Sequence, residues 1–272
     1  MTVIRPPRAG SARHMTSPVC RQCPGIAIDL GSARTRAWAP GRGIILDTRT
    51  VTFPGTGTSY PVQRGTIVDP EGTARMLDRL LGRRVPRFGH PVIALTTPVL
   101  GGIAYREAAR TALQVLRPRT VLTIPTAKAI ALGADADPSK PLLIVDIGAH
   151  LTEVFLLTDG AVTDAHRTAL GTDDLDYTPC RELTESVVTV VTGMLRRDHT
   201  SQTLDALRNG VLLAGGGALR PEITHGLAAQ LHVPVRPAPA PHTVAVRGAA
   251  KHLQAVHHRS PDADFTHTPP PP

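Results

Sequence analysis

Two aspartates occupy the same place in two short segments of similar sequence, each two residues before a glycine. Asp29 and Gly31 lie in IAIDLGSART, and Asp146 and Gly148 lie in LIVDIGAHLT. A glycine lets the backbone approach a ligand closely, neighbouring N–H groups can bind an anion, and an aspartate can hold a hydrated cation. Two such bends facing each other across a cleft would hold a polyphosphate and Mg²⁺ from both sides. Because the spacing occurs twice, we favour this interpretation over two ordinary glycine turns.

A third segment, VLLAGGGAL at residues 211–219, places three glycines between an apolar strand and a helix that begins near Pro221. Such a loop lets backbone N–H groups and the helix N-terminus contact the phosphate or ribose of a ligand. Each glycine also loses more conformational entropy on folding than other residues do, so three in a row are unfavourable for a plain turn. We therefore predict ligand contact at Gly215–Gly217, with a structural turn as the alternative.

The elements that must position these motifs fall into two similar halves. In each half an apolar strand precedes the Asp-x-Gly bend, and two further strands follow it to complete a meander. Helical and strand patterns then alternate. In the first half these are helices at 72–81, 105–116 and 126–133 and strands at 92–96 and 120–124; in the second half, helices at 175–195, 222–231 and 242–256 and strands at 211–214 and 233–235.

This pattern predicts an α/β fold of two duplicated domains that face each other across a cleft. We place the first domain at residues 24–136 and the second at 137–257. Residues 1–23 are rich in arginine and proline and are predicted to form a disordered basic arm. Residues 258–272 end in four prolines and are predicted to form a disordered tail.

The composition favours a folded cytoplasmic protein. Of the 272 residues, 41% are hydrophobic and 19% charged, which excludes a wholly disordered chain. The net charge of +8 is uneven, because residues 1–49 hold eight arginines and two acids and so carry +6 of it. Nearly all the basic residues are arginines, which across the whole chain fits coding bias better than a nucleic-acid patch, because a nucleic-acid binder clusters charge on one folded element; we therefore expect no nucleic-acid partner. Three cysteines make no disulfide framework, and no apolar run approaches the roughly 18 residues of a membrane span. His-x₃-His and Gly-x-Ser-x-Gly spacings are also absent.

Taken in order, these segments resemble the MreB/Mbl rod shape-determining proteins, the bacterial actins of the actin/Hsp70/sugar-kinase superfamily. IAIDLGSART resembles the first phosphate loop of that family, LIVDIGAHLTEVFLL the second, and GVLLAGGGALRPEI the adenosine-binding loop. REAARTALQVLRPRTVLTIPTAKAIALGA resembles the helix–strand–helix that connects the lobes. The resemblance runs from about residue 25 to 255 and implies two RNase H-like domains of the actin-like ATPase type around a nucleotide cleft.

The resemblance implies a set of nucleotide-binding residues, with ATP and Mg²⁺ as cofactors and Asp29 and Asp146 holding the Mg²⁺ through water. It also implies self-association into filaments, alone or with other actin homologues, and peripheral contact of a cytoplasmic protein with the membrane. The implied contacts are Asp29, Gly31, Ser32, Ala33 and Arg34 in the first loop; Asp146, Gly148, Ala149, His150 and Leu151 in the second; and Gly215, Gly216, Gly217, Ala218 and Leu219 in the third.

Two segments are shorter than the resemblance would require. The family carries two small outer subdomains, but only TVTFPGTGTSYP occupies the place of the first, and residues 177–209 leave room for only a helix or two in place of the second. The Glu-Arg-Thr-Ala-Glu stretch that helps hold ribose and base in the family has no match here. We therefore expect weak ATP binding and weak or partner-dependent assembly.

The loops themselves also depart from the family pattern. The family has Glu before the proline of the connecting segment, where it positions the attacking water, but this chain has Ile124. The Gly-Gly-Thr of the second loop is replaced by Ala149, His150 and Leu151, and an Asn of the first loop is replaced by Arg34, which could itself contact a phosphate. The resemblance thus implies very slow ATP hydrolysis, or none.

Two other functions remain open from the sequence. One is a small-molecule kinase of the same superfamily, which would need an acidic base and a substrate-bearing insertion. The other is an accessory ATPase of the Hsp70 type that lacks its substrate domain.

Overall fold

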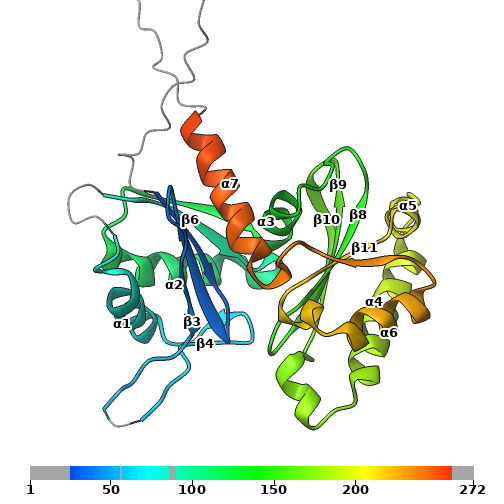
Figure 1. The fold of residues 1–272 in the computed structure, drawn as a ribbon, viewed down its shortest axis with the longest axis horizontal. Coiled ribbons are helices and arrows are strands. Elements are labelled where there is room, and N and C mark those ends of the chain that lie inside the picture. The colour runs from blue at the N-terminus through cyan, green and yellow to red at the C-terminus, as the bar shows by residue number, and fades with distance from the viewer. Residues whose placement is uncertain (1–24, 56, 86–89, 259–272) are drawn as a thin grey trace, which may run out of the picture.

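The computed structural model describes residues 25–55, 57–85 and 90–258, which form two lobes side by side (Figure 1). Each lobe contains a five-stranded sheet. The first sheet has the order β3-β2-β1-β6-β7 and the second β10-β9-β8-β11-β12. The strands are β1 Gly25–Leu30, β2 Arg34–Ala39, β3 Gly43–Arg49, β6 Val92–Thr97 and β7 Thr120–Pro125, then β8 Leu142–Ile147, β9 Thr152–Thr158, β10 Ala161–Thr168, β11 Val211–Ala214 and β12 Val235–Pro237.

The two sheets have the same topology. In each, three antiparallel strands form a meander, and two further strands continue the sheet in parallel from the first strand of that meander. The parallel strands need helical crossovers, which the chain supplies between them. This confirms the predicted fold class of two duplicated α/β domains.

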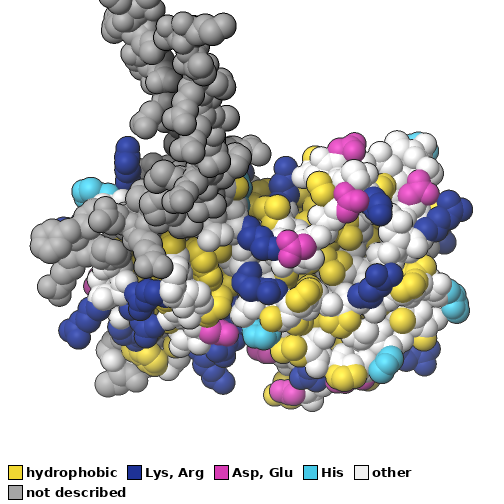
Figure 2. Space-filling view, turned by 45° about the horizontal axis from the view of Figure 1, so that its top comes forward, with side chains coloured by type: hydrophobic (Ala, Val, Ile, Leu, Met, Phe, Trp, Pro, Cys, Tyr) yellow, Lys and Arg dark blue, Asp and Glu magenta, His cyan; other side chains and the backbone are white. Residues whose placement is uncertain are grey.

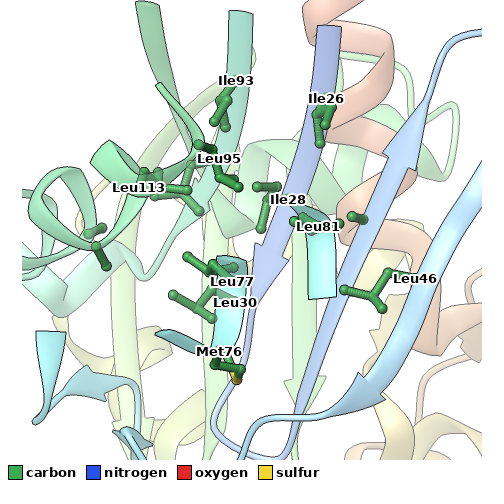
Figure 3. Close-up of a cluster of buried hydrophobic side chains, with 14 of the residues drawn as sticks. Ile26, Ile28, Leu30, Leu46, Met76, Leu77, Leu81, Ile93, Leu95 and Leu113 are labelled. Atoms are coloured by element: carbon green, nitrogen blue, oxygen red, sulfur yellow. The ribbon is translucent and has the colours of Figure 1, made fainter. Parts of the chain in front are cut away.

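The core of the first lobe lies between its sheet and two helices, α1 (Pro70–Leu81) and α2 (Gly102–Leu113). Asp69 caps α1, because its carboxylate accepts a 2.7 Å hydrogen bond from the amide of Gly72, and proline follows at the first helical position. Figure 3 shows how alternate residues of β1 meet side chains of these helices and of β6. The buried set includes Ile26, Ile28, Leu30, Leu77, Leu81, Ile93, Leu95 and Leu113.

The core of the second lobe likewise lies between its sheet and its helices. Apolar residues of β8 and β11 pack against α4 (Cys180–Arg197), α5 (Gln202–Asn209) and α6 (Pro221–Leu231). The helix predicted at 175–195 begins only at Cys180, because Pro179 precedes it and residues 172–176 form a separate 3-10 turn. Pro179 has no N–H to donate and disfavours helix at the residue before it.

Two further helices pack between the lobes, α3 (Thr126–Gly133) and α7 (Val244–His258). α7 comes from the second half of the chain but packs on the first sheet, where Val246 and Leu253 meet apolar residues of β1 and β6. α3 comes from the first half but packs on the second sheet, with Ile130 against Ile144 and Phe155. Each of these two helices therefore packs on the sheet that the other half of the chain forms.

The segment between β3 and α1 is short, as the sequence indicates. Between β3 and α1 the described chain forms one isolated bridge, Thr52 to Ser59, and a small hairpin, β4 (Val62–Gln63) and β5 (Thr66–Ile67), that the sequence analysis did not predict. The turn of this hairpin contacts the other lobe, because Arg64 Nη1 donates a 3.0 Å hydrogen bond to the carbonyl of Ala169.

The surface carries charges of both signs. Figure 2 shows Lys and Arg side chains spread over both lobes on one face, with Asp, Glu and apolar side chains between them. Within the described ranges, no helix combines the length and apolarity that crossing a bilayer requires. The predicted disordered arm and residues 259–272 of the predicted tail lie outside the described residues, whereas His258, the first residue of that tail, ends α7.

Candidate functional site

A cleft of about 800 Å³ lies between the lobes and is lined from both sides. Twelve of the fifteen predicted contact residues line it: Asp29, Gly31, Ser32, Ala33, Arg34, Asp146, Gly148, Ala149, His150, Leu151, Gly215 and Gly216. The other three do not, since Gly217 and Ala218 are buried and the side chain of Leu219 is exposed to solvent. The topology thus brings the three predicted loops to one place.

The two Asp-x-Gly bends are built in the same way. In the first, the amide of Gly31 donates to the carbonyl of Arg34 at 3.1 Å; in the second, the amide of Gly148 donates to the carbonyl of Leu151 at 2.9 Å. A β-carbon at Gly31 would stand 2.9 Å from the Arg34 oxygen, so this close turn needs glycine. Both bends therefore present the backbone of the residues after each aspartate to the cleft.

The first bend is held by polar contacts from neighbouring segments. Ser32 Oγ accepts a 2.9 Å hydrogen bond from the amide of Gly65 in the β4–β5 turn. Arg34, expected to reach a phosphate, instead donates from Nε to Asp47 Oδ1 at 2.6 Å and from Nη2 to the Asp47 carbonyl at 3.0 Å. Its guanidinium is thus paired within the first lobe.

The second bend is held by the segment that follows β10. The amides of Thr172 and Asp173 each donate at 2.9 Å, to the carbonyls of Gly148 and Ala149 respectively. His150 Nε2 lies 3.2 Å from Asp173 Oδ2, so its ring is directed to this carboxylate. The carbonyls of Gly148 and Ala149 are therefore bonded within the second lobe, and the remaining backbone N–H groups are what this loop offers a ligand.

The three glycines of the third loop have different surroundings. Gly215 has φ +80°, and a β-carbon there would stand 2.5 Å from Asp146 Oδ1. A β-carbon at Gly217 would overlap the side chain of Ile147, whereas one at Gly216 would meet nothing within 4 Å. Two of the glycines are therefore required by packing against β8, and Gly216 is the one that leaves open space in the cleft.

Charged side chains form matching rows on the two sheets. Strand pairing places Arg36 opposite both Asp29 and Asp47 in the first lobe, and Glu153 opposite Asp146 in the second. Arg36 Nη1 lies 3.8 Å from Asp29 Oδ2, and its Nε lies 3.3 Å from Asp47 Oδ1. Arginine and glutamate therefore occupy equivalent positions beside the two aspartates.

Glu153 in turn is paired with the next strand of its sheet. Its Oε1 accepts hydrogen bonds from Arg167 Nε at 3.1 Å and Nη2 at 2.7 Å. Burial, followed by the charges of Glu153 and Asp29, raises the pKa of Asp146 to about 7, while the charge of Arg36 acts in the opposite direction. For Asp47, burial alone would raise the pKa, but the hydrogen bond from Arg34 and the charges of Arg34 and Arg36 lower it below its usual value.

The residues around Asp29 and Asp146 do not form a protein-ligated Mg²⁺ site. Asp29 Oδ1 accepts a 2.7 Å hydrogen bond from the Thr96 hydroxyl, and Oδ2 faces the Arg36 guanidinium. No group of three carboxylate, His or Cys side chains suited to a metal occurs in the described part of the chain. Mg²⁺ usually keeps several waters and binds through one or two carboxylates plus substrate phosphates, so the water-mediated contact stays a prediction. The Arg36 guanidinium beside Asp29 opposes a second positive charge at that carboxylate.

Ile124 shares a row with Asp29 across the first sheet. Ile124 on β7 pairs with Thr96 on β6, and the Thr96 hydroxyl donates to Asp29. The side chain of Ile124 is 3% exposed and packs in the apolar cluster that α7 covers. No carboxylate is therefore present at this position of the row.

Comparison with known proteins decides the family. The sequence model of the MreB/Mbl protein family matches residues 55–181 and 178–260, which is more than half of the chain. The chain belongs to the MreB/Mbl family. The cell shape-determining protein Mbl of Bacillus cereus is 24% identical to it over 310 residues, covering 81% of this chain and 93% of the relative. Since the match is longer than this chain, the relative carries residues that this family member lacks.

Solved structures show the same fold. MreB5 of Spiroplasma citri bound to ADP has a TM-score of 0.76 at 17% identity, with 88% of this chain and 99% of that chain covered. The MamK double helical filament has a TM-score of 0.67 at 14% identity, with 87% and 99% covered. The predicted actin-like ATPase fold is thereby confirmed.

Sequence reasoning missed several residues of the cleft, including Arg36, Glu153, Thr96 and the Arg64-Gly65 turn. Arg36 could have been found from the pattern alone. In a tight antiparallel meander, the residue opposite Asp29 must be about as far beyond the bend as Asp29 is before it. The others depend on contacts between segments that are distant in sequence.

Proposed function

We propose that this family member is a minimal MreB-type actin homologue of cell morphogenesis that binds ATP weakly in the interlobe cleft. The observation that carries this proposal is the pair of equivalent bends, Gly31 with Arg34 and Gly148 with Leu151, facing one cleft beside the open space at Gly216. MreB5 of Spiroplasma citri has structures bound to ADP and to AMPPNP, which supports a nucleotide as the ligand.

Weak binding follows from what the cleft lacks. The ribose- and base-holding Glu-Arg-Thr-Ala-Glu stretch of the family has no counterpart between η3 (Thr172–Asp176) and β11. Arg34 is engaged by Asp47, and the second bend carries Ala149 and His150 where smaller residues would expose the backbone. Each lost charge-assisted hydrogen bond to phosphate weakens binding by an amount on the order of 2 kcal/mol.

Hydrolysis is proposed to be very slow or absent. The row formed by Asp29, Thr96 and Ile124 ends in an apolar side chain, which has no lone pair to orient or deprotonate an attacking water. Losing a positioned base costs about 10²–10⁴ in rate. ATP would then act as a bound ligand that stabilises the closed lobes rather than as a substrate that turns over.

Assembly is proposed to be weak or to depend on a partner such as another actin homologue. MamK forms a double helical filament, which supports self-association in this fold. Here the short segments before α1 and after β10 reduce the area for longitudinal contacts, and interfaces below roughly 1,000 Å² are usually transient.

We further propose that any contact with the membrane is salt-sensitive adhesion through the basic residues 1–23, at about 1 kcal/mol per basic residue.

Sedimentation tests this assignment against the alternatives. The purified protein is centrifuged at low micromolar concentration with ATP, AMPPNP or no nucleotide, alone and with a second MreB-family protein. We expect little pelleting alone and an increase with the partner. Robust nucleotide-dependent pelleting by the isolated protein contradicts weak assembly. In a separate activity assay, a phosphorylated small-molecule product would instead identify a kinase.

A further inference from the structure

We propose that Arg36 serves as a built-in counter-charge, so that this cleft binds the triphosphate of a nucleotide without a divalent cation. The inference rests on the proposed function and adds to it the ionic form of the ligand. It concerns one side chain on β2 whose position between carboxylates resembles the position that a bound cation would take.

The guanidinium of Arg36 is held between two carboxylates at the lining of the cleft. Its side chain is 13% exposed and lines the cavity. Carboxylate oxygens of Asp29 and Asp47 lie 3.8 and 3.3 Å away on opposite sides, yet its buried Nε has no hydrogen-bond partner. A guanidinium remains charged at every physiological pH, so this positive charge is permanent.

The same contacts occupy Asp29, one of the two aspartates predicted to attract Mg²⁺. One oxygen of Asp29 accepts from Thr96, and the other faces Arg36. In the second lobe, the Glu153 carboxylate beside Asp146 is held by Arg167. A divalent cation near Asp29 would have to approach the guanidinium at close range, where the repulsion between like charges opposes it.

The remaining donors of Arg36 are suited to phosphate. A guanidinium presents five N–H donors in a planar fork that matches phosphate oxygens, and Arg36, which lines the cavity, is held to Asp29 and Asp47 by ion pairs of 3.8 and 3.3 Å. Arg34, Arg49 and Arg64 also line the cleft. The guanidinium groups of Arg34 and Arg64 donate to Asp47 and Ala169, and Arg49 is an exposed residue at the end of β3, opposite Arg34 rather than Asp29. Arg36 is therefore the arginine best placed to meet a phosphate beside Asp29.

The experiment measures ATP affinity by calorimetry in excess Mg²⁺ and again in EDTA, for the full chain and three variants. For the wild type we expect the two affinities to agree within about threefold. Arg36→Gln removes the charge and frees Asp29, so we expect its affinity to fall at least about tenfold in EDTA and to recover substantially in Mg²⁺. Arg36→Lys keeps the charge and should behave as the wild type.

Arg106→Gln is the matched control, because Arg106 is exposed on α2 and lies outside the cleft. A wild type that binds ATP in Mg²⁺ but loses at least tenfold in EDTA overturns the inference and leaves the proposed function intact. So does an Arg36→Gln variant that binds equally well in EDTA. A wild type that binds ATP under neither condition overturns the proposed function as well. Thermal unfolding of each variant shows that it is folded.

Discussion

Gly248 on α7 lies against the carbonyl oxygen of Ala129 on α3, so closely that a β-carbon at position 248 would overlap it. Gly133 at the end of α3 lies against the carbonyl of Val244, which a β-carbon there would also overlap. These two contacts join the helix that covers the first sheet to the helix that covers the second. The lobes are therefore linked through a crossing that only small residues permit.

Gly248→Ala is expected to separate this crossing. Since the backbone of α3 must move to admit the methyl group, we expect the free energy of unfolding to fall by about 2–3 kcal/mol, measured by urea denaturation. Gly193→Ala on α4 is the control, because the nearest atom to its new β-carbon is the flexible end of Arg197, at 3.2 Å. There the gain in helix propensity should raise stability by about 0.5–1 kcal/mol. Equal effects of the two substitutions would contradict the close crossing.

The pair formed by Glu153 and Arg167 is expected to stabilise the second lobe. Arg167→Met keeps the apolar stem but leaves a largely buried carboxylate beside Asp146 without its partner, so we expect a loss of about 2 kcal/mol in unfolding free energy. Adding Glu153→Gln should restore part of that loss. Arg181→Met, which removes an exposed partner of Glu185, should cost less than about 0.5 kcal/mol. A loss in Arg167→Met that Glu153→Gln does not reduce would mean that lost packing, not charge, dominates.

In the third loop, Gly215 is expected to have a structural role and Gly216 a role in ligand binding. Gly215→Ala combines a positive φ with a β-carbon 2.5 Å from Asp146 Oδ1, so it should lower the unfolding temperature. Gly216→Ala has open space around it and should change stability by less than about 0.5 kcal/mol while weakening ATP binding severalfold. Calorimetry and thermal unfolding on both variants check this. Unchanged ATP affinity in Gly216→Ala would mean that the ligand does not contact this loop.

Ile124→Glu tests the missing water-orienting group. The new carboxylate would stand in the row of Thr96 and Asp29, so phosphate release from ATP should rise measurably. Because Ile124 is buried among apolar side chains, we also expect a loss of stability of about 2–3 kcal/mol, and turnover must be measured where the variant is folded. Thr123→Glu supplies a carboxylate on the opposite face of β7 and should leave turnover unchanged. Wild-type turnover equal to that of ordinary actin homologues would refute the idea.

Much of this architecture could be predicted because it depends on local patterns. The Asp-x-Gly repeats, the apolar strands and the glycine loop each follow from a few neighbouring residues, and the two sheets could be inferred from their repetition. The exchange of α3 and α7 could not, since it depends on Gly133 and Gly248 meeting across the lobes. Nor could the pairing of Arg34 with Asp47, which engages an expected phosphate ligand and depends on the register of β2 and β3.

The most direct test of the account is a calorimetric titration of ATP into the purified full chain. The equivalent bends and the open space at Gly216 predict one saturable site per chain, weaker than nanomolar but with a dissociation constant below about 1 mM. The absence of saturable heat up to several times that concentration, from a protein shown to be folded, would contradict the assignment of this cleft as a nucleotide site.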